Sequence, residues 1–260
     1  MKAIANIGFS TLLCVCLAPS CTKNTTARKK EELVSGSCRI KQLIMKAQGH
    51  KDKSGIFTYN SNGDPVNYTP AGYGNNSLKY EFRYDKIGRL TDYIGYNETW
   101  TPIVCNFWAK YFHDNRNRIV RDSVYYNSNY GAPLASHAQH IGVTVYEYDS
   151  KDRISSISYK QFHNGVPNGI VSYYRFDYNE AGNLIWPGAK YDDKISIYRT
   201  SKVWMFLCRN YSMNNLKPAV SYQPNGLPAS FGATAARGAS MHFLETIDLS
   251  DCEVIYECTK

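Results

Sequence analysis

A short pattern recurs along this chain of 260 residues and constrains its fold more than any other feature. The pattern begins with an aromatic residue, any residue, and then Tyr or His. Asp or Asn follows, then two positions of any type, and then Gly, Asn or Asp before the next apolar residues. Its clearest copy is FRYDKIGRLTDY at residues 82–93, and further copies begin near residues 57, 111, 146, 176 and 221. Each copy predicts a strand, a tight turn and a strand, so the sequence indicates one hairpin used repeatedly.

The turn position carries the strongest signal in the pattern. A hairpin loop built on a type I turn needs one residue with positive φ before the chain returns, and Gly, Asn and Asp accept that conformation most readily. In five copies Asp or Asn opens the loop, where its side chain can accept hydrogen bonds from nearby backbone N–H groups. The predicted positive-φ residues are Gly63, Gly88, Asn117, Asp152, Gly182 and Gly226.

Charged residues at the turns keep a fixed spacing of four. The predicted pairs across the turn are Asp85 with Arg89, Asp114 with Arg118, and Asp149 with Arg153, while Asn179 and Asn183 replace both charges in the next copy. Exposed ion pairs contribute roughly 0.2–1 kcal/mol, so we expect these groups to orient loops and not to catalyse a reaction.

After the turn, apolar residues recur at a spacing of three, as at Leu90 and Tyr93 or Ile154 and Ile157. Strict strand alternation would send such residues to opposite faces. Either a β-bulge or a sheet covered on both faces would explain the spacing.

The composition fits an all-β fold, because Tyr alone accounts for 22 residues and suits a pleated sheet with a wet face. We predict one domain over residues 37–260, an antiparallel meander of successive hairpins curled into an open or nearly closed, barrel-like sheet. The apolar run at residues 203–208 is either a buried strand or a short helix. We favour a helix within 203–210 that caps an open end of the sheet, with closing strands at 240–248 and 252–258.

The N-terminus is typical of an export signal. Residues 1–20 contain a positive start and an apolar run too short to cross a bilayer comfortably, and small residues precede Cys21. The ending Ala18-Pro19-Ser20-Cys21 resembles a bacterial lipoprotein processing site, which implies that Cys21 is lipidated. Ordinary cleavage with release into the periplasm is the alternative. We expect residues 21–36 to be a flexible tether and the mature protein to be anchored by its lipid in the cell envelope, at the outer membrane.

Five cysteines follow Cys21: Cys38, Cys105, Cys208, Cys252 and Cys258. Export permits disulfides, but an odd number leaves at least one cysteine outside them. Cys38 opens the first expected strand. It can reach Cys252 or Cys258 only if the two ends of the sheet meet.

The repeated pattern resembles the YD repeats of the rearrangement-hotspot family, whose core reads aromatic-x-Tyr-Asp-x-x-Gly-Arg-Leu. Tyr84-Asp85 with Gly88-Arg89-Leu90 matches it fully, and the resemblance covers residues 55–232 intermittently. The resemblance implies curved antiparallel β-structure. The chain looks like small bacterial lipoproteins that carry a few degenerate repeats, which implies an architecture and an envelope location but no activity.

The sequence favours binding over catalysis. The formal charge of +8 is scattered and not clustered in a basic stripe, so we expect no nucleic-acid partner. No Gly-x-Ser-x-Gly elbow is present, and His137 and His140 lack a third ligand, so we predict neither an enzyme nor a metal or cofactor.

Aromatic side chains are the remaining candidates for a binding site. Trp100, Trp108 and Trp186 are the predicted ligand-binding aromatics, most plausibly for a glycan or an envelope protein. The structural alternative is that they form cross-strand pairs that hold the sheet together. A lipid-handling half-barrel is a further functional alternative, and a hydrolase is the last.

Overall fold

The computed structural model describes residues 38–46, 53–73, 77–99, 103–129, 140–216, 219–232, 242–244 and 247–258, all within the compact unit Leu33–Lys260. The first ten strands are β1 (Cys38–Met45), β2 (Ser54–Tyr59), β3 (Pro65–Ala71), β4 (Lys79–Tyr84), β5 (Leu90–Asn97), β6 (Val104–His113), β7 (Ile119–Asn129), β8 (His140–Tyr148), β9 (Ile154–His163) and β10 (Val166–Arg175). The remaining elements are β11 (Tyr191–Ile195), η3 (Ile197–Thr200), α1 (Lys202–Leu207), β12 (Asn214–Leu216), β13 (Ala219–Tyr222), β14 (Pro228–Phe231), β15 (His242–Phe243), β16 (Ile247–Asp248) and β17 (Cys252–Cys258).

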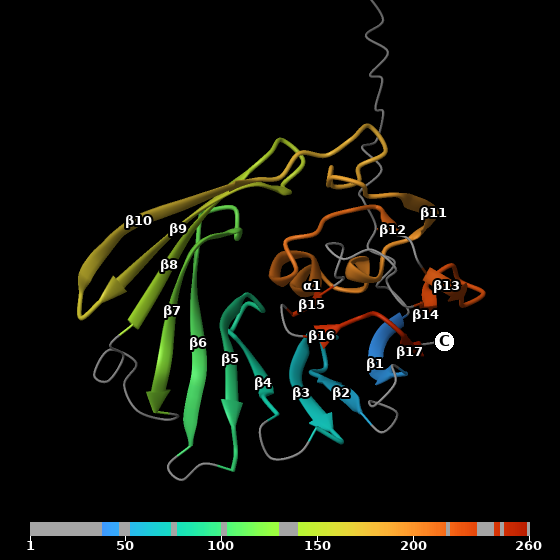
Figure 1. Ribbon diagram of the computed structural model, residues 1–260, viewed down its shortest axis with the longest axis horizontal. Helices are drawn as coiled ribbons and strands as arrows, with labels where there is room; N and C mark the ends of the chain where they lie inside the picture. Colours follow the sequence, from blue (N-terminus) through green and yellow to red (C-terminus); the bar gives the residue numbers. More distant parts are fainter. Residues whose placement is uncertain are drawn as a thin grey trace, which may run out of the picture. The chain divides into compact units, whose positions relative to one another are not determined.

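The predicted all-β meander is confirmed. Thirteen strands form one open sheet in the order β10-β9-β8-β7-β6-β5-β4-β3-β2-β1-β17-β14-β13, so the first ten strands lie in chain order (Figure 1). Adjacent strands of this sheet pair antiparallel throughout. The first and last strands of the described chain meet inside this open sheet, because β17 pairs with β1 and a disulfide joins Cys38 to Cys258.

The turns have the predicted conformation. In the clearest copy the Asp85 carboxylate accepts the backbone N–H groups of Ile87 and Arg89, and the Gly88 N–H donates to the Asp85 carbonyl. These bonds close the loop and set the register of the two strands. Positive φ occurs at all six predicted positions: Gly63 (84°), Gly88 (82°), Asn117 (62°), Asp152 (58°), Gly182 (81°) and Gly226 (84°).

The predicted Asp–Arg pairs also form, each with a closest N–O distance of 2.7 Å: Asp85–Arg89, Asp114–Arg118 and Asp149–Arg153. Asn179 keeps the backbone half of this arrangement by accepting the Asn183 N–H at 2.9 Å. The Asn183 amide instead bonds the side chain and backbone of Asn214, so the uncharged copy ties its turn to β12.

Tyrosines also connect neighbouring turns of the pattern. The hydroxyls of Tyr84 and Tyr148 donate to the carbonyls of Pro65 and Ile119, which are the first strand residues after the preceding turns. The Arg118 guanidinium lies 4.9 Å from the centre of the Tyr148 ring, where cation–π attraction adds to the contact. Tyr and Arg therefore recur because they join consecutive turns along one edge of the sheet.

A β-bulge accounts for the spacing of three after the turn. The register shifts between Arg83 and Tyr84, which leaves Thr91 without a partner opposite it and returns Leu90 and Tyr93 to the same core. A corresponding shift between Glu147 and Tyr148 does the same for Ile154 and Ile157.

The predicted short helix is present as α1, but it lies on a face of the sheet instead of capping an open end. Ser201 caps its N-terminus by accepting the Val203 N–H. Trp204 contacts Phe57 of β2 and Phe82 of β4, with ring centroids 5.2 and 5.6 Å apart. Phe206 contacts Tyr111 of β6 and Tyr146 of β8 at 5.3 and 5.1 Å. One six-residue helix touches strands from β2 to β8 because the sheet bends around it, so this face is concave (Figure 1).

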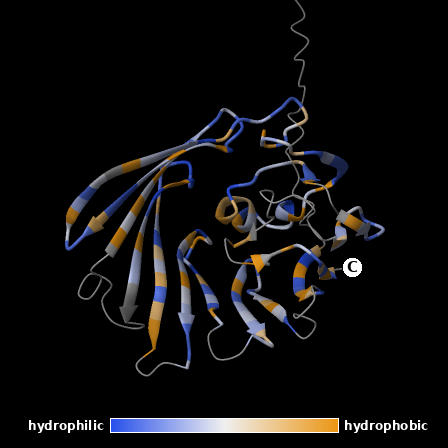
Figure 2. Ribbon diagram, viewed as in Figure 1, coloured by the Kyte–Doolittle hydropathy of each residue, from blue (hydrophilic) through white to orange (hydrophobic). Residues whose placement is uncertain are grey.

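The four contact residues are the opening aromatics of the first four copies of the pattern. Hydrophobic residues are otherwise interspersed with hydrophilic ones along the strands (Figure 2). The motif aromatics therefore build the core between the sheet and α1.

The expected closing strands are only partly correct. Residues 252–258 form β17 in the main sheet, as predicted. Within 240–248, β15 and β16 pair with each other as a separate ribbon, and Phe243 packs on Trp204. No helix among the described residues is long and apolar enough to cross a membrane.

Candidate functional site: an aromatic ladder on the concave face

A second row of aromatic residues crosses the concave face farther from the turns. This aromatic ladder consists of Tyr68, Tyr80, Tyr93, Phe107, Tyr126 and Tyr159. Ring centroids lie 5.4 Å apart for Tyr68–Tyr80, 5.5 Å for Tyr80–Tyr93 and 4.9 Å for Tyr93–Phe107. Phe107 is directly opposite Tyr126, and the Tyr126 and Tyr159 hydroxyls are 3.5 Å apart.

Glycines make room for three rings of the ladder. A Cβ atom added at Gly55, Gly95 or Gly142 would lie 2.0, 2.3 or 2.8 Å from the ring of Tyr68, Phe107 or Tyr159. A ring that covers a strand glycine compensates for the missing side chain and limits the movement of the ring. The glycines therefore fix the rings flat against the sheet.

The ladder changes from buried to exposed along the sheet. Tyr68 and Tyr80 are each 3% exposed, whereas Tyr126 and Tyr159 are only half-buried. On the next strand, Tyr174 lies opposite Ile157 on the same face and is 55% exposed. Aromatic surface is therefore available over β7–β10.

Two amide side chains extend from the hydroxyl group of Tyr159. The Gln161 amide donates to the Tyr159 hydroxyl at 2.9 Å, and its carbonyl accepts from the Asn168 amide at 3.0 Å. Gln161 and Asn168 are both exposed. We call Tyr126, Tyr159, Tyr174, Gln161 and Asn168 the open aromatic patch.

The chemistry of this patch is that of a neutral binding surface. None of its five side chains carries a charge at neutral pH, and amides and hydroxyls both donate and accept hydrogen bonds. Aromatic rings supply flat apolar contact area beside those groups. A cavity of 50 Å³ is lined by Tyr126, Ile141, Gln161, Phe162, His163 and Asn168.

Of the three predicted Trp residues, Trp108 and Trp186 are described, and they lie in different parts of the fold. Trp108 is 7% exposed on the outer face, where its indole N–H donates to Asp92 at 2.8 Å and Arg83 covers its ring at 5.0 Å. It packs with Ile94 and Cys105, so it is not available to stack on a ligand. Trp186 is 54% exposed on the connection from β10 to β11, and Trp100 lies outside the described residues.

Cross-strand pairing is instead the role of Trp108, as the structural alternative proposed. Sequence reasoning missed the residues that do form an exposed aromatic surface. One signal was present: Ile157, Tyr159 and Gln161 alternate with polar residues on one strand, and Gly142 stands on the strand before them.

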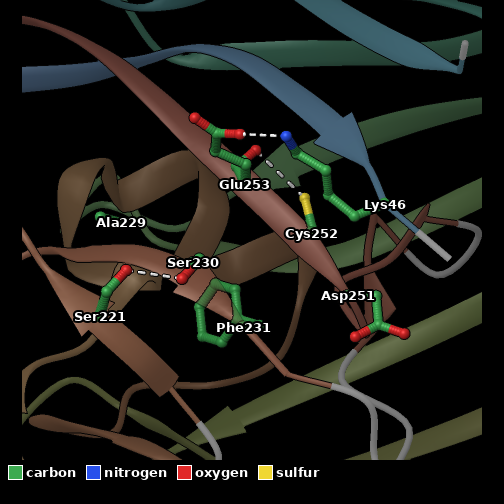
Figure 3. A pocket seen from close by; sticks show the side chains of 8 residues that line it. All are labelled: Lys46, Ser221, Ala229, Ser230, Phe231, Asp251, Cys252 and Glu253. Carbon is green, nitrogen blue, oxygen red and sulfur yellow. Dashed lines mark hydrogen bonds and ion pairs between the residues drawn. The ribbon is translucent and has the colours of Figure 1, made fainter. Parts of the chain in front are cut away.

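A separate cavity of 280 Å³ lies between β14 and β17 (Figure 3). The Ser221 and Ser230 hydroxyls bond each other at 2.6 Å, Lys46 pairs with Glu253 at 2.7 Å, and the Cys252 thiol donates to the Glu253 carbonyl. These groups bond to one another, and no histidine is among the described residues that line the cavity. The arrangement does not assemble an activated nucleophile.

The described part of the chain contains no group of three His, Cys, Asp or Glu residues that could hold a metal ion. The predicted weak pair, His137 and His140, cannot be placed: His137 lies outside the described residues and the side chain of His140 is not described.

Comparison with protein-family models and with curated proteins finds no match for this chain. The candidate function therefore depends on the geometry of the open aromatic patch.

Proposed function

We propose that this protein is a lipid-anchored protein of the bacterial cell envelope that binds neutral glycans on its open aromatic patch and catalyses no reaction. The observation that carries the proposal is the placement of half-buried Tyr159 beside the amides of Gln161 and Asn168, with exposed Tyr174 on the same concave face. The predicted Trp residues have no part in it.

A sugar ring fits this surface by its chemistry. Its C–H groups pack against the electron-rich face of an aromatic ring, while its hydroxyls need partners that both donate and accept. None of the five side chains of the patch is charged, which favours an uncharged sugar over an acidic one, because none of them could offset the desolvation of a carboxylate or sulfate.

The anchor is proposed on the sequence alone. Acyl chains on Cys21 would hold the protein at the outer membrane, since two lipid signals suffice for stable attachment. Residues 21–36 would then separate the sheet from the lipid surface, and the repeated turns would be those of YD repeats. Palmitate incorporation that survives Cys21→Ser would contradict this assignment.

The lipid-handling alternative has less support than glycan binding. An apolar trough on the concave face would have to lie where Trp204 and Phe206 already fill the space between the strands.

The test is binding of the full-length protein to an array of neutral and acidic oligosaccharides, followed by calorimetry with a bound neutral sugar. Tyr159→Ala should weaken binding about tenfold, which corresponds to ~1.4 kcal/mol. Tyr173→Ala is the matched control, because Tyr173 is 76% exposed on the opposite face of the neighbouring strand. Loss of neutral-sugar binding in Tyr173→Ala but not in Tyr159→Ala would reject the patch.

The outer face of β10 supports protein binding as a second candidate. Tyr173 and Val171 are exposed there, on an edge strand whose free backbone can pair with another strand. A variant with Tyr173→Ala that keeps its sugar binding but loses an envelope partner would favour this scaffold function.

A further inference from the structure

The pairing of β1 with β17 has the same register as a turn of the repeated pattern. In the clearest copy Tyr84 is opposite Leu90, and Thr91 is bulged out before Asp92 pairs with Arg83. The same register occurs between β17 and β1, which we call the chain ends. Tyr256 is opposite Ile40, and Lys41 is bulged out before Gln42 pairs with Ile255. Val254, which corresponds to the opening aromatic of the pattern, is 2% exposed in the core.

The charged pair of the pattern is present as well. Arg39 and Glu257 are opposite each other, and their side chains form an ion pair at 2.8 Å. They occupy the places that Arg89 and Asp85 hold in the intact copy. Arg39 also lies 4.8 Å from the centre of the Tyr59 ring, as Arg118 lies over Tyr148.

The tyrosine bonds between consecutive turns continue through the chain ends. Tyr59 donates to the Ile40 carbonyl at 2.5 Å, and Tyr256 donates to the Pro228 carbonyl at 2.8 Å. The bonds from Tyr84 to Pro65 and from Tyr148 to Ile119 have the same geometry between intact copies. The Ile40 carbonyl therefore accepts this hydrogen bond from the first copy, and the Tyr256 hydroxyl donates it to the sixth copy.

At the place of the turn the ends carry a disulfide. Cys258 follows Glu257 and Cys38 precedes Arg39, so the sulfurs bridge the two strands where the loop residues would stand. The neighbouring sixth turn contacts this bridge, because the Asn225 amide donates to the Cys38 sulfur at 3.1 Å. Arg89 similarly reaches from its own turn to Asn117 in the next, at 3.3 Å.

We infer that the two chain ends form a seventh repeat unit, split between β17 and β1, in which the Cys38–Cys258 disulfide takes the place of the turn. The sheet is then a continuous series of units from the sixth copy through the split unit to the first four, and the fifth copy follows β10 with only an isolated bridge between Tyr178 and Leu184. Completion of the series depends on thiol oxidation, which suits an exported protein. This inference does not rest on the proposed glycan binding.

The first test is a double-mutant cycle on Arg39→Ala and Glu257→Ala in the full chain. The coupling should change the folding equilibrium constant about two- to fivefold with the disulfide present. It should fall in a Cys38→Ser/Cys258→Ser background, because the bridge fixes the ends of β1 and β17 next to Arg39 and Glu257. The matched pair Arg153 and Asp149 should couple equally in both backgrounds. Coupling of Arg39 with Glu257 that is as strong without the disulfide as with it would overturn the inference.

A second test needs no cysteine variant and applies even if the serine protein does not fold. Tyr256→Phe removes the hydroxyl that bonds Pro228, and Tyr148→Phe removes its counterpart between intact units. The two variants should lower the folding equilibrium constant by similar factors, between about two- and tenfold. A silent Tyr256→Phe beside a destabilising Tyr148→Phe would show that the split unit does not behave as a repeat.

Discussion

The concave face has two regions that differ in origin. The covered region, near the turns, consists of Phe57, Phe82, Tyr111 and Tyr146 packed on α1. The open aromatic patch lies farther from the turns on β7–β10, and its aromatic and amide side chains are half-buried or exposed.

The difference separates the residues that form the scaffold from those of the candidate site. The covered region is made from residues of the repeated pattern, which recur because every unit needs them to hold the turn and contact the core. None of the residues of the open patch belongs to the repeated pattern. A repeat that must keep its turn leaves the far ends of its strands able to vary, and binding residues are expected there.

The largest expected effect comes from removing the centre of the covered region. Trp204→Ala should lower the free energy of unfolding by about 3–5 kcal/mol, because Trp204 is fully buried and contacts strands β2 and β4. Tyr159→Ala, in the open patch, should cost about 1 kcal/mol or less. Urea denaturation measures both values. Equal losses would mean that the two regions are not distinct.

Two glycines allow a more direct comparison of the regions. Gly55→Ala places a methyl group against the buried ring of Tyr68 and should cost about 1–3 kcal/mol, because neither side can yield. Gly142→Ala presses on the outer end of the half-buried Tyr159 ring, which can tilt into solvent. Gly142→Ala should therefore cost less than Gly55→Ala while it still weakens sugar binding. Denaturation and calorimetry on the same two proteins check both parts, and a greater stability loss in Gly142→Ala would contradict the assignment.

The sequence predicts the parts of the fold that depend on residues repeated in every copy of the pattern. The turns follow from Gly63, Asn117 and their counterparts, because few residue types tolerate positive φ. The apolar run at residues 203–208 was compatible with either a buried strand or a short helix, and the structure shows the favoured helix as α1. Its position on the concave face does not follow, since that depends on how far the sheet bends.

The candidate site was less predictable for a related reason. Trp108 is large and aromatic, but its strand position faces Asp92 and Arg83, which cover it. Tyr159 is one of many tyrosines in the sequence, and its half-buried position on the concave face is set by long-range packing of the strands. Residue type therefore identified aromatic candidates, while exposure was decided by the fold.

A buried acid provides a test of how dry the covered region is. Asp122 is 4% exposed on the concave face, where it accepts hydrogen bonds from the Tyr146 hydroxyl and, at 3.1 Å, from the Thr144 N–H. Burial raises the pKa of Asp122 above its usual value, although these hydrogen bonds and the nearby Arg209 oppose the shift.

The smallest expected effect is therefore a pH dependence that Asp122→Asn should remove. A raised pKa means that the folded protein holds the Asp122 proton more tightly than the unfolded chain does. The resulting stabilisation is complete below the unfolded pKa of about 3.9 and is lost as pH rises through the folded pKa. The amide can still accept the Thr144 bond and needs no proton, so the two proteins should unfold at similar urea concentrations at low pH. The Asn variant should gain relative stability as the pH increases towards neutrality. Urea titrations across that range measure the difference, and a constant difference would mean that water reaches Asp122 and that the covered region is not dry.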